Sequence, residues 1–454
     1  YQLRDYSALL PYLKAGYASS RIKRFNERNE TILDFGKIEP KDLQLTIDAG
    51  LQTTLQQKLA NFAPATKAYR HLQRTSVVVI DASSGDLLAS ANWPLPDYDR
   101  LAEEKETYRD KFRRRGEWTA YTDMDLGVTF ATPPGSTAKV MSALAGLRKL
   151  DETGGDIKDK VYPIYARELI HVGAEPTGYV GLHRAIIESS NLYFINLVNE
   201  MDLYEELAHI YESAGVSIGS VPAYRFDYHA YNPESGWKDR VTSVAGNATA
   251  TYRDYISKRK GGNSATHRPM TFCEPWRWAW GQGTIDMTPL SMARIAATVV
   301  NKGNMPITRF LLSEDTHQVP VVSEERVEDL KEAMRAEAHK ILRDGRSRRF
   351  AAYPSLGGKT GTPERVLDWV NKTDRMANPK VRPINPRKAN DGWYICFVED
   401  AQITHKDKDG QIVKKKGPLG IAVRVERTVT SGSSYAKNIA DKLVMDALSK
   451  EGYF

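Results

Sequence analysis

The chain has 454 residues, 41% of them hydrophobic, which is enough for one large domain or two average ones with an apolar core. Lys and Arg number 64 against 57 Asp and Glu, but the basic runs lack the interleaved aromatic side chains of single-strand binders, so we expect no nucleic acid partner. The two cysteines, Cys273 and Cys396, exclude a disulfide scaffold, and no stretch reaches the roughly 18 apolar residues that a membrane-spanning helix needs.

The N-terminal part combines a polar segment and a helix. Residues 1–40 carry no sustained apolar period and are interpreted as a linker or the remnant of an N-terminal accessory region. A helix should follow, with Thr46 and Asp48 as capping side chains and Pro64 as its end. Its apolar face consists of Leu51, Leu55, Leu59 and Phe62.

A hairpin, a charged segment and a second helix come next. The β-branched run 76–80 and the run 87–93, separated by turn residues, predict a β-hairpin. Residues 98–118 are densely charged and indicate a surface excursion. The segment 133–135 then opens an apolar helix that should end at Gly154. The apolar face of that helix consists of Val140, Leu144 and Leu147.

The second half of the chain mixes helices with late strands. Thr288 and Pro289 open one predicted helix, and Ser323 opens another that should stop at Gly345. The second helix carries an apolar stripe of Val327, Leu330, Met334 and Ile341. A last helix is expected with Ser434 as its cap. Strands are predicted at 357–362, 393–398 and 419–425. The order predicts an α+β fold, in which helices sandwich a central, mainly antiparallel sheet.

The first chemical motif is Ser136-Thr137-Ala138-Lys139, at the predicted start of a helix. Three residues are nearly one helical turn, so the Ser136 and Lys139 side chains share a face. A serine hydroxyl is a weak nucleophile until a base takes its proton, and a lysine amine can be that base if burial or nearby positive charge lowers its pKa. Alone the motif is weak, because a capping serine with a surface lysine is the commoner explanation.

The second motif, Ser189-Ser190-Asn191, lies between two apolar helical runs. Small polar residues at such a corner normally cap a helix. In the functional interpretation, Ser189 relays a proton to a leaving amine and Asn191 binds a peptide carbonyl.

The third motif, Lys359-Thr360-Gly361-Thr362, lies in a short strand. A glycine in a strand marks the close approach of a ligand backbone, and the lysine and hydroxyls suit a carboxylate, although a turn beside a bulge explains the tetrapeptide as well.

The three motifs occur together, with 53 residues from Ser136 to Ser189 and 170 from Ser189 to Lys359. This set and its order are those of penicillin-binding proteins and serine β-lactamases. Over roughly residues 41–450 the chain resembles the transpeptidase domain of the penicillin-binding proteins, of the monofunctional class B. Further matching segments are 45–52, 77–89, 281–293 and 393–397. The resemblance implies a β-lactamase/transpeptidase-like fold and a transpeptidase domain over residues 41–454.

The resemblance implies a role for each catalytic residue. Ser136 would attack the carbonyl of the penultimate D-alanine, and Lys139 would take its proton. Ser189, together with Lys359, would pass a proton toward the departing D-alanine. The backbone N–H groups of Ser136 and Thr362 would hold the oxyanion.

The resemblance also implies a substrate site and partners. Asn191 would orient the donor peptide, and Lys359, Thr360, Gly361 and Thr362 would receive its terminal carboxylate. The expected partners are peptidoglycan stem peptides, β-lactam antibiotics and a membrane glycan polymerase. The catalytic domain is expected outside the cytoplasmic membrane, held by an anchor that is absent from this chain. No cofactor is implied, and the nine histidines show no metal-ligand spacing, so we expect no metal.

Two other classes of function share these motifs. A β-lactamase or D,D-carboxypeptidase would hydrolyse the acyl-enzyme, but no Glu-x-x-Leu-Asn sequence follows Asn191, and the nearest candidate, Glu234, has different neighbours. A β-lactam sensor or peptidoglycan-binding module would be acylated once without turnover.

One departure from the family pattern concerns segment 132–135, which keeps the Pro-Gly but lacks the aromatic-acidic pair often found there.

Overall fold

The computed structural model describes the greater part of the domain. No helix within the described residues combines the length and hydropathy that crossing a membrane requires. The described residues are 23–25, 31–34, 44–65, 75–93, 125–128, 131–165, 175–215, 275–281, 285, 287–343, 355–363, 390–406, 412–428 and 432–454.

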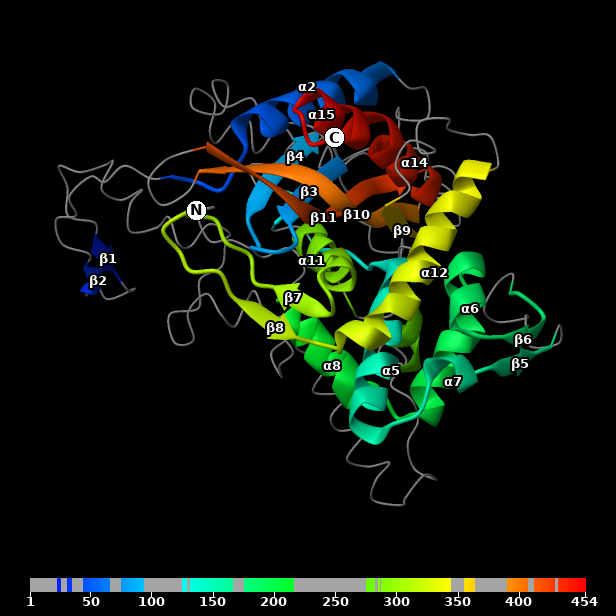
Figure 1. Ribbon diagram of the computed structural model, residues 1–454. Coiled ribbons are helices and arrows are strands. Elements are labelled where there is room, and N and C mark those ends of the chain that lie inside the picture. The colour runs from blue at the N-terminus through cyan, green and yellow to red at the C-terminus, as the bar shows by residue number, and fades with distance from the viewer. Residues whose placement is uncertain are drawn as a thin grey trace, which may run out of the picture.

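A five-stranded sheet forms the centre of the domain, and each pair of neighbouring strands in it is antiparallel (Figure 1). The sheet joins an early hairpin to a late one, because β3 pairs with β11 along seven residue pairs from Leu419↔Asp81 to Val425↔Thr75. The spatial order of the strands is β4 (Leu87–Trp93), β3 (Thr75–Asp81), β11 (Ile412–Thr428), β10 (Asn390–Lys406) and β9 (Leu356–Gly361).

Helices cover both faces of the sheet, because the alternation of side chains along the strands gives each face its own core. In β10, Trp393, Ile395 and Phe397 belong to one apolar cluster, whereas the intervening Tyr394 and Cys396 belong to the other. The second cluster is covered by α2 (Ala49–Ala65), α14 (Gly432–Ile439), a π-helical turn (Ala440–Val444) and α15 (Met445–Lys450).

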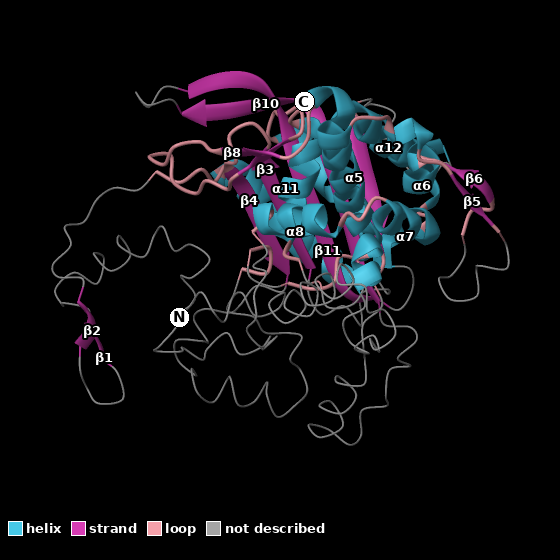
Figure 2. Cartoon of the chain, turned by 90° about the horizontal axis from the view of Figure 1, so that it is seen from below, coloured by secondary structure: helices cyan, strands magenta, loops and turns pink. Residues whose placement is uncertain are grey.

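The first cluster extends into a helical lobe on the other side of the sheet (Figures 1 and 2). Its helices are α5 (Lys139–Thr153), α6 (Leu182–Glu188), α7 (Asn191–Glu200), α8 (Tyr204–Ser213), α11 (Pro289–Val300) and α12 (Glu324–Arg343). The short strands are β1 (Lys23–Phe25), β2 (Thr31–Asp34), β5 (Tyr162–Ile164), β6 (Gly178–Val180), β7 (Asn304–Pro306) and β8 (Gln318–Pro320). They pair as three separate hairpins. The 3₁₀ turns are Gly135–Ala138, Ile157–Asp159 and Pro275–Trp280.

The structure confirms the predicted α+β class and the helix starts that rest on strong capping signals. Thr288 accepts a hydrogen bond from the Ser291 N–H, and Pro289 opens α11. Gly154 ends α5 with a φ of 79°, a left-handed value that glycine adopts without strain. The predicted hairpin is β3 and β4.

Five local predictions were wrong in detail. The Thr46 hydroxyl donates to the carbonyls of Leu87 and Arg309, so Asp48 alone caps α2, through the Leu51 N–H at 3.0 Å. The α2 helix ends at Ala65, one residue beyond Pro64. Three further differences concern the late elements: α14 begins at Gly432 rather than at Ser434, and β10 and β11 each run for 17 residues.

The extra length of the two long strands has a simple cause. Ala401–Lys406 of β10 pairs with Ile412–Gly417 of β11, so the ladder continues past the edges of β9 and β3 (Figure 2). Ile403 is buried in this extension, whereas the consecutive residues Lys414, Lys415 and Lys416 are exposed on both of its faces. Several other predictions lie outside the described residues, namely the segment 98–118, Glu234, Cys273 and Gly345.

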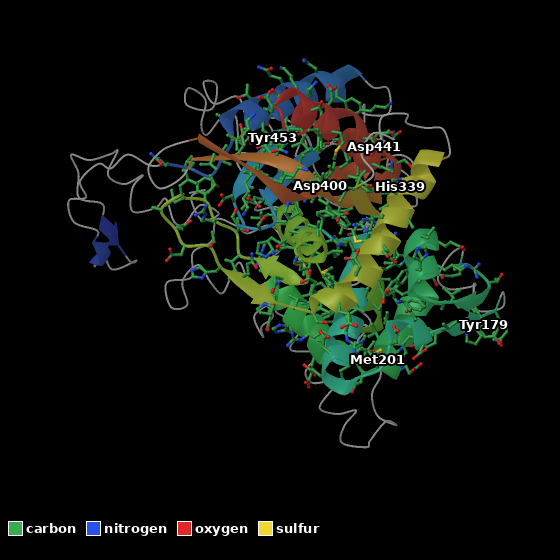
Figure 3. The ribbon with its side chains drawn as sticks, in the orientation of Figure 1. Tyr179, Met201, His339, Asp400, Asp441 and Tyr453 are labelled. Carbon is green, nitrogen blue, oxygen red and sulfur yellow. The ribbon has the colours of Figure 1, made fainter. Side chains whose placement is uncertain are left out.

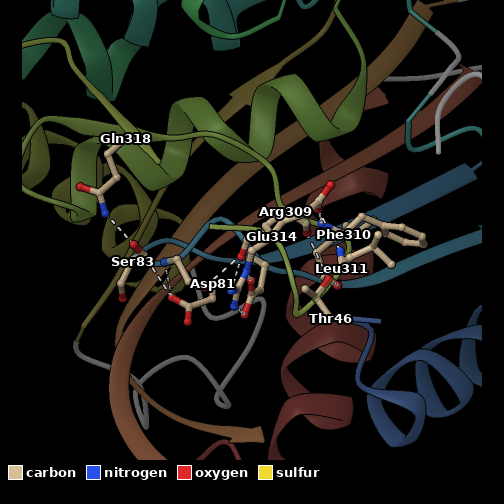
Figure 4. A network of polar contacts seen from close by, with 11 residues as sticks. Thr46, Asp81, Ser83, Arg309, Phe310, Leu311, Glu314 and Gln318 are labelled. Carbon is tan, nitrogen blue, oxygen red and sulfur yellow. Dashed lines mark hydrogen bonds and ion pairs between the residues drawn. The ribbon is translucent and has the colours of Figure 1, made fainter. Parts of the chain in front are cut away.

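A polar network ties the β3–β4 turn to the connection between β7 and β8 (Figure 4). The Arg309 guanidinium donates to both oxygens of Asp86, at 2.5 and 2.9 Å, and its third contact is the Glu314 carbonyl. The Glu314 carboxylate in turn accepts the backbone N–H groups of Phe310 and Leu311. Because the Asp86 side chain is only 3% exposed, this bidentate pair fixes a connection that has no strand of its own in the central sheet.

Replacing Arg309 with alanine should lower the free energy of unfolding by about 2 to 4 kcal/mol, because the buried Asp86 carboxylate would lose its cation. Chemical denaturation measures the difference. Lys158→Ala is the control, since Lys158 is 70% exposed in its pair with Asp329 and its removal should leave the midpoint unchanged. Equal midpoints for Arg309→Ala and the parent chain would contradict the assignment.

Candidate active site

Ser136 lies in the 3₁₀ turn that leads into α5, and glycines set the position of that turn. Gly135 has a φ of 57°, and a Cβ there would lie 2.7 Å from the Pro363 nitrogen. Its N–H donates to the Gly281 carbonyl at 3.0 Å, where a Cβ on Gly281 would lie 2.0 Å from the Gly135 oxygen. Only residues without a side chain permit this crossing, which explains the predicted Pro-Gly opening of the helix.

The strand β9 passes directly beside the Ser136 turn. A Cβ on Gly361 would lie 2.7 Å from the Pro134 carbonyl oxygen and 2.9 Å from the Thr137 nitrogen. The Trp393 indole N–H donates to the Pro133 carbonyl at 2.9 Å and holds the preceding loop against the sheet. The first and third motifs, more than 200 residues apart in sequence, are therefore in backbone contact.

Lys139 is the first residue of α5 and is fully buried. Its amine donates to the Ser189 hydroxyl at 3.0 Å and also contacts the Ser189 carbonyl oxygen. Burial lowers the pKa of Lys139 well below its usual value, and the nearby Lys359 lowers it further, while Glu175 opposes the shift. Within the described residues both hydrogen bonds of this amine go to Ser189, so the first and second motifs meet through it.

Ser189 connects two lysines. It ends α6 in a left-handed conformation, with a φ of 60°, and that corner exposes both its hydroxyl and its carbonyl to Lys139. The Lys359 amine donates to the same hydroxyl at 3.1 Å and to the Thr360 carbonyl at 3.1 Å. Lys359 is also fully buried, and burial lowers its pKa, opposed by Glu337. All three predicted motifs therefore converge on one site.

Asn191 begins α7, next to a carboxylate that the sequence analysis did not single out. Glu175 accepts the Ser190 hydroxyl at 2.7 Å and the Asn191 N–H at 2.8 Å. It also faces the Leu192 N–H at 3.4 Å. A carboxylate in this position neutralises the exposed N–H groups and the positive end of the helix dipole. Glu175 thus fixes the second motif at the helix start, and no spacing rule links it to that motif in sequence.

Thr360 and Glu337 form a second contact that the sequence analysis missed. Glu337 of α12 is 3% exposed, and its Oε1 accepts the Thr360 hydroxyl at 3.0 Å. Thr360 pairs with Tyr394, whereas Lys359 pairs with Ile395 on the opposite face of the sheet. The assignment of Thr360 to a substrate carboxylate stays a prediction. Glu337 had a detectable signal, because it interrupts the apolar stripe of Val327, Leu330, Met334 and Ile341 at helical spacing.

Comparisons with known proteins give the class and the family. The model of the penicillin binding protein transpeptidase domain matches residues 75–403, which is more than half of the chain. The chain belongs to this family, and the resemblance to the class B penicillin-binding proteins inferred from its motifs is confirmed.

Individual relatives are distant. Peptidoglycan D,D-transpeptidase MrdA of Acinetobacter baumannii is 25% identical over 281 residues, which cover 60% of this chain and 35% of that protein. The chain thus spans about a third of the length of this relative.

Solved structures show the same fold. PBPA from Mycobacterium tuberculosis superposes with a TM-score of 0.55 at 20% identity, over 90% of this chain and 82% of that one. Its ceftriaxone acyl-enzyme complex gives 0.54 at 19% identity, over 90% and 80%. A chain of a peptidoglycan synthase complex gives 0.56 at 18% identity, over 95% and 66%. The predicted transpeptidase-like fold is confirmed.

Gly361→Ala should separate the third motif from the Ser136 turn, because the new Cβ would overlap backbone atoms that cannot move aside. We expect a destabilisation of about 1 to 3 kcal/mol, the range for overpacking, measured by thermal unfolding. Gly181→Ala is the matched control, since its Cβ would make an ordinary 3.6 Å contact with Val161. Equal losses in both variants would show that β9 does not approach the turn as described.

Proposed function

We propose that this domain is a serine D,D-transpeptidase that cross-links peptidoglycan stem peptides through an acyl-enzyme at Ser136. The observation that carries the proposal is the complete burial of the Lys139 amine, which lowers its pKa and favours the neutral form. A neutral lysine amine has two N–H groups and one lone pair, and the Lys139 amine already directs hydrogen bonds to two atoms of Ser189. With its pKa lowered by burial, its remaining lone pair is free to accept the Ser136 proton.

Acylation follows from this arrangement. Ser136 attacks the carbonyl carbon of the penultimate D-alanine as its proton passes to Lys139. The backbone N–H groups of Ser136 and Thr362 stabilise the oxyanion, and the contact of Gly361 with the Ser136 turn supports that assignment. The departing D-alanine amine then takes a proton through Ser189, whose hydroxyl contacts both lysines. An amine of a second stem peptide attacks the ester and releases the cross-linked product.

The remaining motif residues bind the donor peptide. Asn191 orients the peptide from the start of α7, and Lys359, Thr360, Gly361 and Thr362 form the carboxylate site. The Lys359 cation supplies the attraction for a carboxylate, and its hydrogen bond to the Ser189 hydroxyl supports that role. Because the Thr360 hydroxyl contacts Glu337, Thr362 is the hydroxyl of this pair that we expect to contribute most.

The same site accounts for inhibition by β-lactams, which resemble the D-alanyl-D-alanine end and leave a slowly resolved ester. Support comes from the ceftriaxone acyl-enzyme of the Mycobacterium tuberculosis protein, which has the same fold.

We further propose that residues 41–454 form the transpeptidase domain, with residues 1–40 as a linker or accessory remnant. This domain would act outside the cytoplasmic membrane, anchored there and working with a glycan polymerase. The fold shared with a peptidoglycan synthase complex supports the last point.

Ser136→Ala should abolish covalent labelling by penicillin, because the variant lacks the hydroxyl that forms the acyl-enzyme in the proposed mechanism. Intact-protein mass spectrometry measures the added drug mass on the parent chain and its absence on the variant. An adduct that persists for hours supports the transpeptidase, whereas rapid loss supports a β-lactamase. Formation of a cross-linked dimer from D-alanyl-D-alanine peptides separates the enzyme from a single-use sensor. Labelling of Ser136→Ala would overturn the proposal.

Lys139→Ala should slow acylation by roughly 10²-fold or more, the scale of a lost general base. In the parent chain, the lowered pKa of Lys139 means that the neutral amine persists well below the usual lysine pKa, so acylation should rise with pH on the acid side as Lys139 loses its proton. Lys158→Ala is the control, because Lys158 is 70% exposed in its pair with Asp329. Stopped-flow measurements with a chromogenic cephalosporin give both rates. Near-normal acylation by Lys139→Ala would reassign the base.

A further inference from the structure

A carboxyl group is buried behind the strand that carries the third motif. Glu337 reaches the far side of β9 from α12, where its Oε1 accepts the hydroxyl of Thr360 at 3.0 Å and faces the Thr360 N–H at 3.4 Å. Its side chain is 3% exposed, whereas Glu332 on the same helix is exposed. A carboxyl group withdrawn from water in this way costs stability unless a cation compensates it.

The cation with the largest electrostatic effect on Glu337 is Lys359, the residue before Thr360. Burial raises the pKa of Glu337, and Lys359 is the strongest influence that lowers it again. The same attraction acts in the other direction, because Glu337 raises the pKa of Lys359 against the effect of burial. The two groups therefore favour each other's charged form across the strand.

The two lysines of the site compete for protonation. Each amine lies about 3 Å from the same Ser189 oxygen, so the two nitrogen atoms are at most about 6 Å apart. Two buried cations at that distance repel each other, and one proton is therefore held more tightly than the second. Which lysine keeps its proton depends on the anion next to each.

The two anions are not equivalent. Glu175, the anion near Lys139, is only half-buried and accepts hydrogen bonds from Ser190 and the start of α7. Glu337, the anion near Lys359, is buried, and its described hydrogen bonds come from Thr360 alone. Solvent and helix N–H groups screen the first charge more than the second.

We propose that Glu337 is the positioning residue that keeps the proton on Lys359 and thereby leaves Lys139 as the neutral amine of the site. The inference rests on the proposed acyl transfer, and Glu337 acts through Lys359 without touching the substrate. It gives the two lysines different tasks. Lys359 remains a cation that attracts a carboxylate and supplies a proton through Ser189, and Lys139 accepts the proton of Ser136.

Two other charged groups face Glu337, but they pair with each other, so we assign this role to Glu337. Lys437 of α14 and Asp441 of the π-helical turn form their own ion pair at 2.6 Å, and each influences Glu337 with the opposite sign. Tyr394 of β10 lies beside this pair, with the Lys437 amine 5.7 Å from its ring centre. Figure 3 shows His339 on α12 and Asp441 at the end of the molecule where α12 meets the C-terminal helices.

The test is the pH profile of acylation in Glu337→Gln. This substitution removes the charge, while the amide oxygen can still accept the hydrogen bond from Thr360. Lys359 should therefore lose its proton at lower pH than in the parent chain. We expect acylation by a chromogenic cephalosporin to fall about tenfold on the alkaline side, with rates that converge on the acid side, where Glu337 is protonated in the parent chain as well. Glu332→Gln makes the same change at an exposed site and should reproduce the parent profile.

Glu337→Asp separates charge from shape. Its carboxylate keeps the charge but withdraws from Thr360 by one methylene, so the alkaline limb should move less than in Glu337→Gln and in the same direction. If Glu337→Gln does not fold, the limb of the aspartate variant decides the question. Profiles of the folded variants that keep the parent shape at any overall rate would overturn the inference and leave a structural role. Failure of the parent chain to acylate at Ser136 would instead overturn the proposed function.

Discussion

The structure depends on one shared hydroxyl. The Ser189 oxygen lies within hydrogen-bonding distance of two buried amines, Lys139 at 3.0 Å and Lys359 at 3.1 Å. Each amine comes from a different layer, the first from helix α5 and the second from strand β9. Both amines are withdrawn from water, so displacing any one of these segments would leave a buried polar group without a partner, and each segment therefore holds the others in register.

The backbone is built to allow that convergence. Ser189 takes a left-handed conformation between two helices, which turns its carbonyl and its hydroxyl toward the lysines. Gly135 and Gly361 let a loop and a strand approach to distances that a side chain would prevent. The sheet fixes the strand, because β9 pairs with β10 along six residues and the Trp393 indole reaches the Pro133 carbonyl beside the Ser136 turn.

The sequence predicted the elements that have local signals and, through the family resemblance, the fold and the joint site, but it did not reveal the contacts of two buried or half-buried carboxylates. The hairpin of β3 and β4, the start of α11 and the three motifs depend on signals within a few residues, and the structure has them in the expected places. Glu175 and Glu337 escaped notice, because their meaning comes from partners 16 and 23 residues away. Glu337 also lies on a helix with several exposed glutamates, and only its position within the apolar stripe distinguishes it from them.

The burial of these charges explains why stability alone does not account for the site. Replacing a buried ion pair with apolar residues is often neutral or stabilising, so two buried lysines and a buried carboxyl are a poor way to hold a fold together. They are a good way to obtain amines of different proton affinity side by side, because desolvation lowers both lysine pKa values and a single buried anion opposes that shift for one of them. Two identical side chains can then serve as base and as acid in one reaction. The asymmetry that we propose between them depends on Glu337, a position the three motifs do not include.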